Sequence, residues 1–179
     1  MCLITEHAHA KKRIKELETE VVQLNEQVEQ FKEQYEPELP TGYPTFDISW
    51  ADLKAELEAL GVQCMLLANH IPDSFVRHTD EANWAKIMPF LTYSANLYVE
   101  GVADCDDYSR WAAADSSKKF KLNGCLECWG DMPLGYHAFN LVRIGTGKYK
   151  IFEPNAGFEY AGTPMDFGEQ GYLPKCWRL

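Results

Sequence analysis

Apolar residues in the first part of the chain recur at alternating spacings of three and four. The positions, separated mainly by Glu, Gln, Lys and Asn, are Ile14, Leu17, Val21, Leu24, Val28, Phe31 and Tyr35. This heptad pattern is typical of a coiled-coil helix, and three heptads are too few for a lone helix in water. The sequence therefore predicts self-association, as a dimer from the β-branched and Leu core positions or as a trimer from the bulky Phe31 and Tyr35. An amphipathic helix lying on its own domain is the alternative.

A break rich in proline and glycine follows this seam. It contains Pro37, Pro40, Gly42 and Pro44, none of which favours a continuing helix. We therefore divide the chain into an oligomerisation helix over residues 1–36, a linker over 37–47 and a folded domain over 48–179. Within that domain we expect a helix over 50–60 capped by Ser49 and helical segments over 81–88 and 90–99.

Composition excludes several classes of function. The 179 residues contain 17 Lys and Arg against 27 Asp and Glu, a net charge of −10 that argues against a general nucleic-acid binder. No apolar run approaches the roughly 18 residues of a membrane span. The amino end lacks the pattern of an export signal, which predicts a soluble protein that first resides in the cytoplasm. Six cysteines are many for that compartment, so thiol or metal chemistry must be considered.

The segment ADCDDYSRWAAA, residues 103–114, predicts a helix that begins at Cys105. Asp104 can cap this helix, and Asp107 stands three residues later as the acidic partner in a capping box. The positive end of the helix dipole then favours the thiolate of Cys105, although the carboxylates of Asp104 and Asp106 oppose it. Cys105 is therefore a candidate nucleophile, and a buried small hydrophobe is the alternative.

Apolar residues alternate on both sides of Gly145–Thr146–Gly147, which predicts a β-hairpin over residues 136–155. With a three-residue loop, His137, Glu153 and Asn155 share one face of the hairpin. A two-residue loop would place Glu153 on the opposite face. A histidine that takes up a proton needs an acceptor on its far ring nitrogen, and Glu153 or Asn155 can supply one. A hairpin histidine that hydrogen-bonds only to backbone is the alternative.

The order cysteine on a helix, histidine on a strand, then an acid or amide on the next strand resembles papain-like and transglutaminase-like cysteine proteases. The segments concerned are residues 103–114, 135–144 and 150–157. They look especially like phage and bacterial transglutaminase-like cysteine proteases and the calcium-dependent papain-like C-terminal domain of the fairy-ring mushroom agglutinin. The resemblance implies an α+β fold in which an antiparallel sheet packs on the nucleophile-bearing helix, preceded by the N-terminal coiled-coil helix.

This resemblance also implies a site and an activity. It makes Cys105 the nucleophile, His137 the general base and Glu153 the orienting acid, with Asn155 as the substitute. The implied activity is cysteine-dependent acyl transfer, first peptide-bond hydrolysis and second transamidation, on a protein or peptide substrate. Calcium would bind the three carboxylates next to the nucleophile, those of Asp104, Asp106 and Asp107. The glutamine that papain-like enzymes place before the nucleophile is absent, and Asn96 is the nearest amide.

Two further hypotheses stay open at this point. Cys125 and Cys128 have CxxC spacing, which is half of a zinc site if His137 or Cys176 completes it, and otherwise a pair of structural thiols in a loop. The second hypothesis is a non-enzymatic, oligomeric structural component, for example of a phage virion, on a papain-like shell that has lost its chemistry. The strict heptads and the missing amide before Cys105 favour this second hypothesis.

Overall fold

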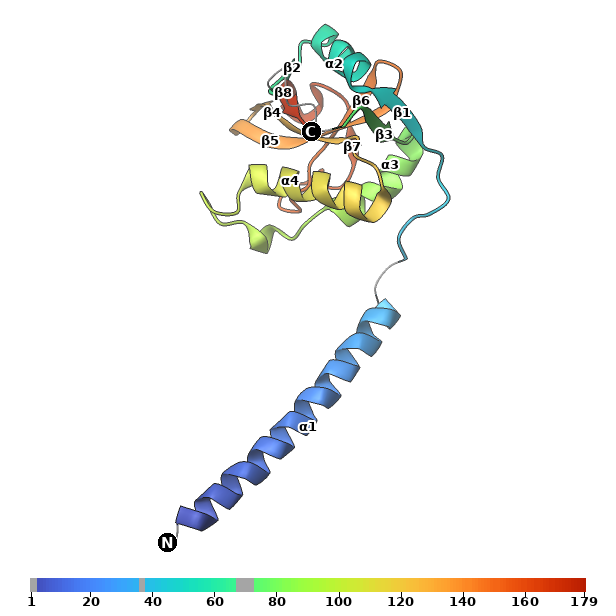
Figure 1. Ribbon diagram of the computed structural model, residues 1–179. Helices are drawn as coiled ribbons and strands as arrows, with labels where there is room; N and C mark the ends of the chain where they lie inside the picture. Colours follow the sequence, from blue (N-terminus) through green and yellow to red (C-terminus); the bar gives the residue numbers. More distant parts are fainter. Residues whose placement is uncertain (1–2, 36–37, 67–72) are drawn as a thin grey trace. The chain divides into compact units, whose positions relative to one another are not determined.

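The computed structural model describes residues 3–35, 38–66 and 73–179, and the chain divides into two units, Met1–Glu38 and Leu39–Leu179 (Figure 1). The first unit contains one helix, α1 (Leu3–Tyr35). The described seam side chains are 43–56% exposed; they are Ile14, Leu17, Val21, Leu24 and Val28. The side chains of Phe31 and Tyr35, and the predicted boundary at 36–37, lie outside what the structure describes. The helix is thus observed, while its coiled-coil pairing is not confirmed.

The second unit is built on a six-stranded sheet with the order β2-β8-β4-β5-β6-β7. Its strands are β2 (Gln63–Cys64), β8 (Leu173–Arg178), β4 (Cys125–Met132), β5 (Gly135–Gly145), β6 (Lys148–Phe152) and β7 (Pro164–Met165). The β2–β8 pair is parallel and the other pairs are antiparallel. A separate antiparallel pair joins β1 (Phe46–Ser49) to β3 (Phe75–His78). The predicted α+β class is confirmed. The more specific prediction of a papain-like core is not confirmed.

Three helices cover the two faces of the large sheet (Figure 1). They are α2 (Trp50–Ala59) on one face, with α3 (Glu81–Ile87) and α4 (Cys105–Asp115) on the other. Each face of the sheet has its own hydrophobic core, and successive side chains of β5 point alternately into the two. Leu141 packs in the cluster that contains α2 residues, and Val142 packs in the cluster of α3 and α4. No helix in the described part of the chain has an apolar stretch long enough to cross a membrane.

The segment after α3 differs from the sequence prediction. The helix expected over 90–99 is wrong, since only two short 3₁₀ turns form, η1 (Met88–Leu91) and η2 (Ala95–Leu97). The backbone of Tyr93 is instead extended and pairs with the chain after β6, donating to Pro154 at 2.8 Å and accepting from Ala156 at 2.9 Å. This long-range pairing outcompetes the local helical pattern. The predicted linker over 37–47 is also too long, because β1 begins at Phe46.

Candidate functional site

Cys105 occupies the first position of α4. Asp104 is the N-cap in extended conformation, and the Asp107 carboxylate accepts a hydrogen bond from its backbone N–H at 3.3 Å, as in a capping box. The Asp104 carboxylate in turn accepts from the N–H of Gly101 at 3.0 Å, which ties the preceding turn to the helix start. Cys105 is partly exposed. Its thiol therefore lies at a helix N-terminus that solvent and small molecules can reach.

The β5–β6 hairpin has the register that the three-residue loop predicts. Asn140 pairs with Phe152 and Leu141 with Ile151, and the alignment shifts only near the turn, between Arg143 and Gly145. Such a shift is a β-bulge, which accommodates the extra residue at the turn without changing the pairing of the rest of the strand. Continued past the end of β6, the same register places Glu153 on the face of His137.

His137 and Glu153 form a direct pair. The His137 Nε2 and Glu153 Oε2 atoms are 2.8 Å apart, and both side chains are buried, at 9% and 1% exposure. Asn155 takes part through its main chain, because its N–H donates to Glu153 Oε1 at 2.9 Å. The Asn155 side chain instead accepts from the N–H of Gly157 at 2.9 Å. The structure therefore places Glu153, and not the Asn155 amide, against the imidazole.

Tyr172 is a member of the site that the sequence did not indicate. Its hydroxyl donates to Glu153 Oε2 at 3.0 Å, the same oxygen that contacts His137, and its ring lies 6.2 Å from the imidazole. It comes from the turn before β8, 19 residues after Glu153. No motif or spacing marks this residue, so only the fold could identify it.

The surroundings of His137 favour its charged form. Burial lowers the pKa of the imidazole, but the Cys105 side chain and the Glu153 carboxylate outweigh burial and raise the pKa to about 9. At neutral pH the ring thus holds a proton on both nitrogens. An imidazolium next to a thiol stabilises the thiolate, and it can also donate a proton to a leaving group.

Two hydrogen bonds attach the Cys105 helix to the strand of His137. The Ser109 hydroxyl donates to the carbonyl of Phe139 at 2.9 Å, and the Asn140 side chain donates to the carbonyl of Ser109 at 2.9 Å. Ser109 follows Cys105 by four residues, and Asn140 follows His137 by three. These bonds therefore hold the helix and the strand in a fixed relation near the candidate site.

The three predicted calcium ligands lie together. One carboxylate oxygen from each of Asp104, Asp106 and Asp107 lies within 4.8 Å of the others. Arg110 pairs with Asp106 at 2.9 Å and with Asp107 at 2.8 Å. The guanidinium thus already neutralises part of the charge, and calcium binding stays a prediction.

The positions of Cys125 and Cys128 disfavour the zinc alternative and agree with structural thiols. Both cysteines are buried in β4 and not in a loop. Residues three apart on a strand point to opposite faces, and accordingly Cys125 packs in the α3–α4 cluster and Cys128 in the α2 cluster. Burial raises the pKa of both thiols, which disfavours the thiolate that zinc requires.

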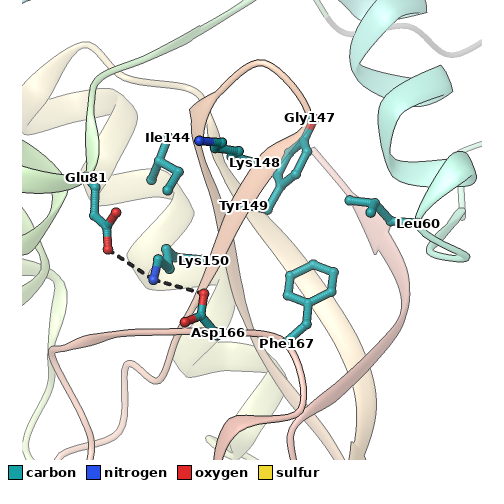
Figure 2. Close-up of a pocket in the computed structure, with 9 residues that line it drawn as sticks. All are labelled: Leu60, Glu81, Ile144, Gly147, Lys148, Tyr149, Lys150, Asp166 and Phe167. Atoms are coloured by element: carbon teal, nitrogen blue, oxygen red, sulfur yellow. Dashed lines mark ion pairs between the residues drawn. The ribbon is translucent and has the colours of Figure 1, made fainter.

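A surface pocket of about 470 Å³ lies at the turn end of the β5–β6 hairpin (Figure 2). Lys150 projects into it and pairs with Glu81 at 3.0 Å and with Asp166 at 2.9 Å. The residues that line it include Leu60, Ile144 and Phe167 but none of the candidate catalytic side chains. Since none of the candidate catalytic side chains lines it, we treat the pocket as separate from the site at Cys105.

Comparison with known proteins gives similar solved structures and no family. No family model matches the chain, and no curated protein matches it either. One solved structure, described as a PSL1a–E64 complex, has a TM-score of 0.50 and 19% identity over 73% of this chain and 50% of that chain. Another, a Polyporus squamosus lectin bound to a human-type influenza-binding epitope, has a TM-score of 0.44 and 16% identity over 72% and 44%. The chain thus spans about half of either protein.

These findings overturn the family resemblance drawn from the sequence. The similar structure with a TM-score of 0.50 is that of PSL1a, a lectin, and no model of a papain-like or transglutaminase-like protease family matches the chain. The assignment to that superfamily is therefore wrong, and so is the description as a cysteine protease or transglutaminase-like protein that depended on it. At 19% identity the likeness to PSL1a concerns the fold alone. Any chemistry must be argued from the residues of this chain.

Proposed function

We propose that the Leu39–Leu179 unit is a thiol-dependent acyl-transfer enzyme with Cys105 as its nucleophile. The observation that carries this proposal is the buried His137–Glu153 pair, 2.8 Å apart, whose imidazole pKa rises to about 9 through Glu153 and Cys105 despite burial. A buried histidine held in its charged form beside a partly exposed thiol is an arrangement suited to nucleophilic catalysis.

In the proposed reaction the Cys105 thiolate attacks an acyl carbonyl carbon and forms a C–S bond, while the carbonyl electrons move to oxygen. The tetrahedral intermediate collapses and expels the leaving alcohol or amine, which takes a proton from the His137 imidazolium. Water then attacks the thioester with His137 as general base, and the acid product leaves as the thiol is restored. Glu153 supports the positive charge of His137 in both half-reactions.

The intermediate oxyanion needs hydrogen-bond donors near Cys105. Asn96, the nearest amide in the sequence, is exposed in η2 and fills no buried position. The first turn of α4 offers a better source, because the first N–H groups of a helix have no intrahelical acceptor. We assign the oxyanion to the backbone N–H of Cys105, which the helix dipole also favours.

The similar structure of PSL1a adds independent support. It is described as a complex with E64, an epoxide that alkylates nucleophilic thiols. Binding of E64 is a property of PSL1a, and this chain spans only half of the length of that protein. It nevertheless supplies a suitable chemical probe for Cys105.

The test is competitive alkylation of the full chain by E64 and by iodoacetamide, followed by mass spectrometry of the peptides. We expect Cys105 to react at least tenfold faster than Cys64 and Cys176, which are also partly exposed and serve as internal controls. Replacing Glu153 with Gln should slow the labelling of Cys105 and leave the labelling of the other two unchanged. Equal labelling of the three thiols would reject the proposal.

We also propose that α1 mediates self-association. Its described seam residues are exposed, and β-branched residues at Ile14, Val21 and Val28 alternate with Leu17 and Leu24, which favours a parallel dimer. If the thiol proves inert, this self-association supports the second candidate function, a non-enzymatic assembly component.

The test of self-association uses two neighbouring valines of equal exposure, each 56%. Val21 belongs to the seam and Val22 lies beside it. In sedimentation equilibrium we expect Val21→Glu to give monomers because like charges would meet in the seam. Val22→Glu should sediment as the wild type does. A wild-type mass that is monomeric at every concentration would refute the proposal.

Calcium binding can be tested by removing Arg110, because its guanidinium competes with Ca²⁺ for the same carboxylates. A cation that binds Asp106 and Asp107 must displace the Arg110 guanidinium, so Arg110→Gln should increase the affinity for Ca²⁺ in calorimetric titration. If neither the wild type nor Arg110→Gln gives a heat of binding with Ca²⁺, the calcium prediction is wrong.

A further inference from the structure

The turn that precedes the Cys105 helix is unusually apolar for an exposed segment. Four of its side chains are about half or more exposed: Leu97 at 49%, Tyr98 at 46%, Val99 at 53% and Val102 at 75%. Such side chains scattered singly need no explanation, but four exposed apolar side chains within six residues are a local concentration of apolar area. We call residues 97–102 the apolar turn.

Backbone hydrogen bonds fix the shape of the apolar turn. Val99 and Ala103 exchange two of them, at 2.9 and 2.8 Å, and the N–H of Val102 donates to the carbonyl of Val99 at 3.0 Å. Gly101 has a φ of 71°, which the tight reversal requires, and its N–H donates to the Asp104 cap. Because these bonds exist without a ligand, the surface is already organised for binding.

The apolar turn lies beside the proposed nucleophile. Tyr98 shows this proximity, because desolvation and then the negative charges of Asp104 and Cys105 raise its pKa. Its ring is also 6.5 Å from that of Tyr108, in the first turn of α4. On the histidine side, Leu134 is 84% exposed three residues before His137. Apolar side chains are therefore exposed close to both reacting groups.

We propose that the apolar turn binds the acyl portion of the substrate, so that the site selects acyl groups with an extended apolar chain. This inference rests on the thiol mechanism proposed above and names its substrate class. A substrate that covers exposed apolar side chains removes their area from water, which favours binding. Each methylene of the substrate that also leaves water adds to the binding free energy. The carboxylate of Glu100 within the turn and that of Asp104 just after it disfavour an anionic acyl chain.

The experiment measures kcat/KM for p-nitrophenyl acetate, butyrate and hexanoate, each divided by the rate with a free thiol to remove intrinsic reactivity. For the wild type we expect kcat/KM to rise about 2- to 4-fold for each added methylene. Val102→Ser should reduce the gain with chain length by at least half, measured as the ratio of kcat/KM for hexanoate to kcat/KM for acetate within the variant. Val102 is three-quarters exposed, so its replacement leaves the fold intact.

Phe75→Ser is the matched control. Phe75 is 62% exposed on β3, and its replacement should preserve the full chain-length gain. Turnover of all three esters at equal normalised rates would overturn the inference while leaving the thiol mechanism standing. An equal loss in Phe75→Ser and Val102→Ser would overturn it as well. Absence of any turnover, together with an unreactive Cys105, would instead reject the mechanism, and the inference would fall with it.

Discussion

Replacing Glu153 with Gln tests the electrostatic argument at its centre. Glu153 is 1% exposed and its Oε2 atom lies 2.8 Å from His137, whose pKa is raised from its ordinary 6.5 to about 9. At 1.36 kcal/mol for each tenfold change in proton affinity, that difference corresponds to about 3 kcal/mol of folding free energy. Gln keeps the size of the side chain and removes its charge. Cys105 still raises the pKa of His137 in this variant, but the contribution of Glu153 is lost, so we expect that pKa to fall well below about 9.

The sign of the pH dependence follows from the raised pKa. A group that binds its proton more tightly in the folded state stabilises the fold fully below its unfolded pKa. The contribution of His137 is therefore complete below pH 6.5 and is lost as the pH rises through about 9. In Glu153→Gln this loss between neutral and alkaline pH should become smaller, because only the contribution of Cys105 still raises the pKa, and the protein should be less stable at neutral pH.

Urea unfolding followed by circular dichroism at pH 6 and pH 9.5, under reducing conditions, measures this difference. We expect the free energy of unfolding to fall more in the wild type than in Glu153→Gln, by at most about 3 kcal/mol, because Cys105 supplies part of the raised pKa. The control is Glu159→Gln, a replacement at an exposed position six residues later that should behave as the wild type. NMR titration of the histidine ring protons gives the pKa directly. If wild type and Glu153→Gln lose the same stability over this pH range, the assigned role of the pair is refuted.

Three other substitutions test the framework around the site. Tyr172→Phe removes the hydroxyl that donates to Glu153 at 3.0 Å, and we expect chemical denaturation to show a loss of about 2 kcal/mol; unchanged stability would contradict a functional hydrogen bond there. Gly130→Ala should lower the free energy of unfolding by about 1–3 kcal/mol, because the new Cβ would collide with the carbonyl oxygen of Leu173 in β8. An unaltered melting curve would disprove this close approach. Glu56 has a pKa of about 2, so its stabilisation is lost as the pH falls from 4.5 to 2, and Glu56→Gln should flatten the acid limb of the unfolding curve. An acid limb of unchanged slope would exclude that role.

The sequence predicted those parts of the fold in which local rules and long-range packing agree. The helix at Cys105 has its capping acids within three residues, and the hairpin carries its turn signal between two alternating strands. The helix expected over 90–99 failed because Tyr93 pairs with Pro154, a contact across some sixty residues that no local window contains. The expected loop at Cys125 and Cys128 is a strand, and CxxC spacing that brings two thiols together in a loop places them on opposite faces of a strand.

Within the site, the sequence could supply partners that lie along one chain segment but not those that the sheet brings in from elsewhere. His137 and Glu153 follow from the register of a single hairpin, whereas Tyr172 reaches the same carboxylate from the turn before β8. That arrangement has an energetic reason. Burying the charge of Glu153 costs free energy that polar partners must offset. The His137 imidazolium supplies the opposite charge, and the Tyr172 hydroxyl and the Asn155 N–H donate hydrogen bonds to the carboxylate oxygens. The pair is therefore stable only as a set of three donors on one acid, so a fold that retains Glu153 without His137 would leave a buried charge unpaired.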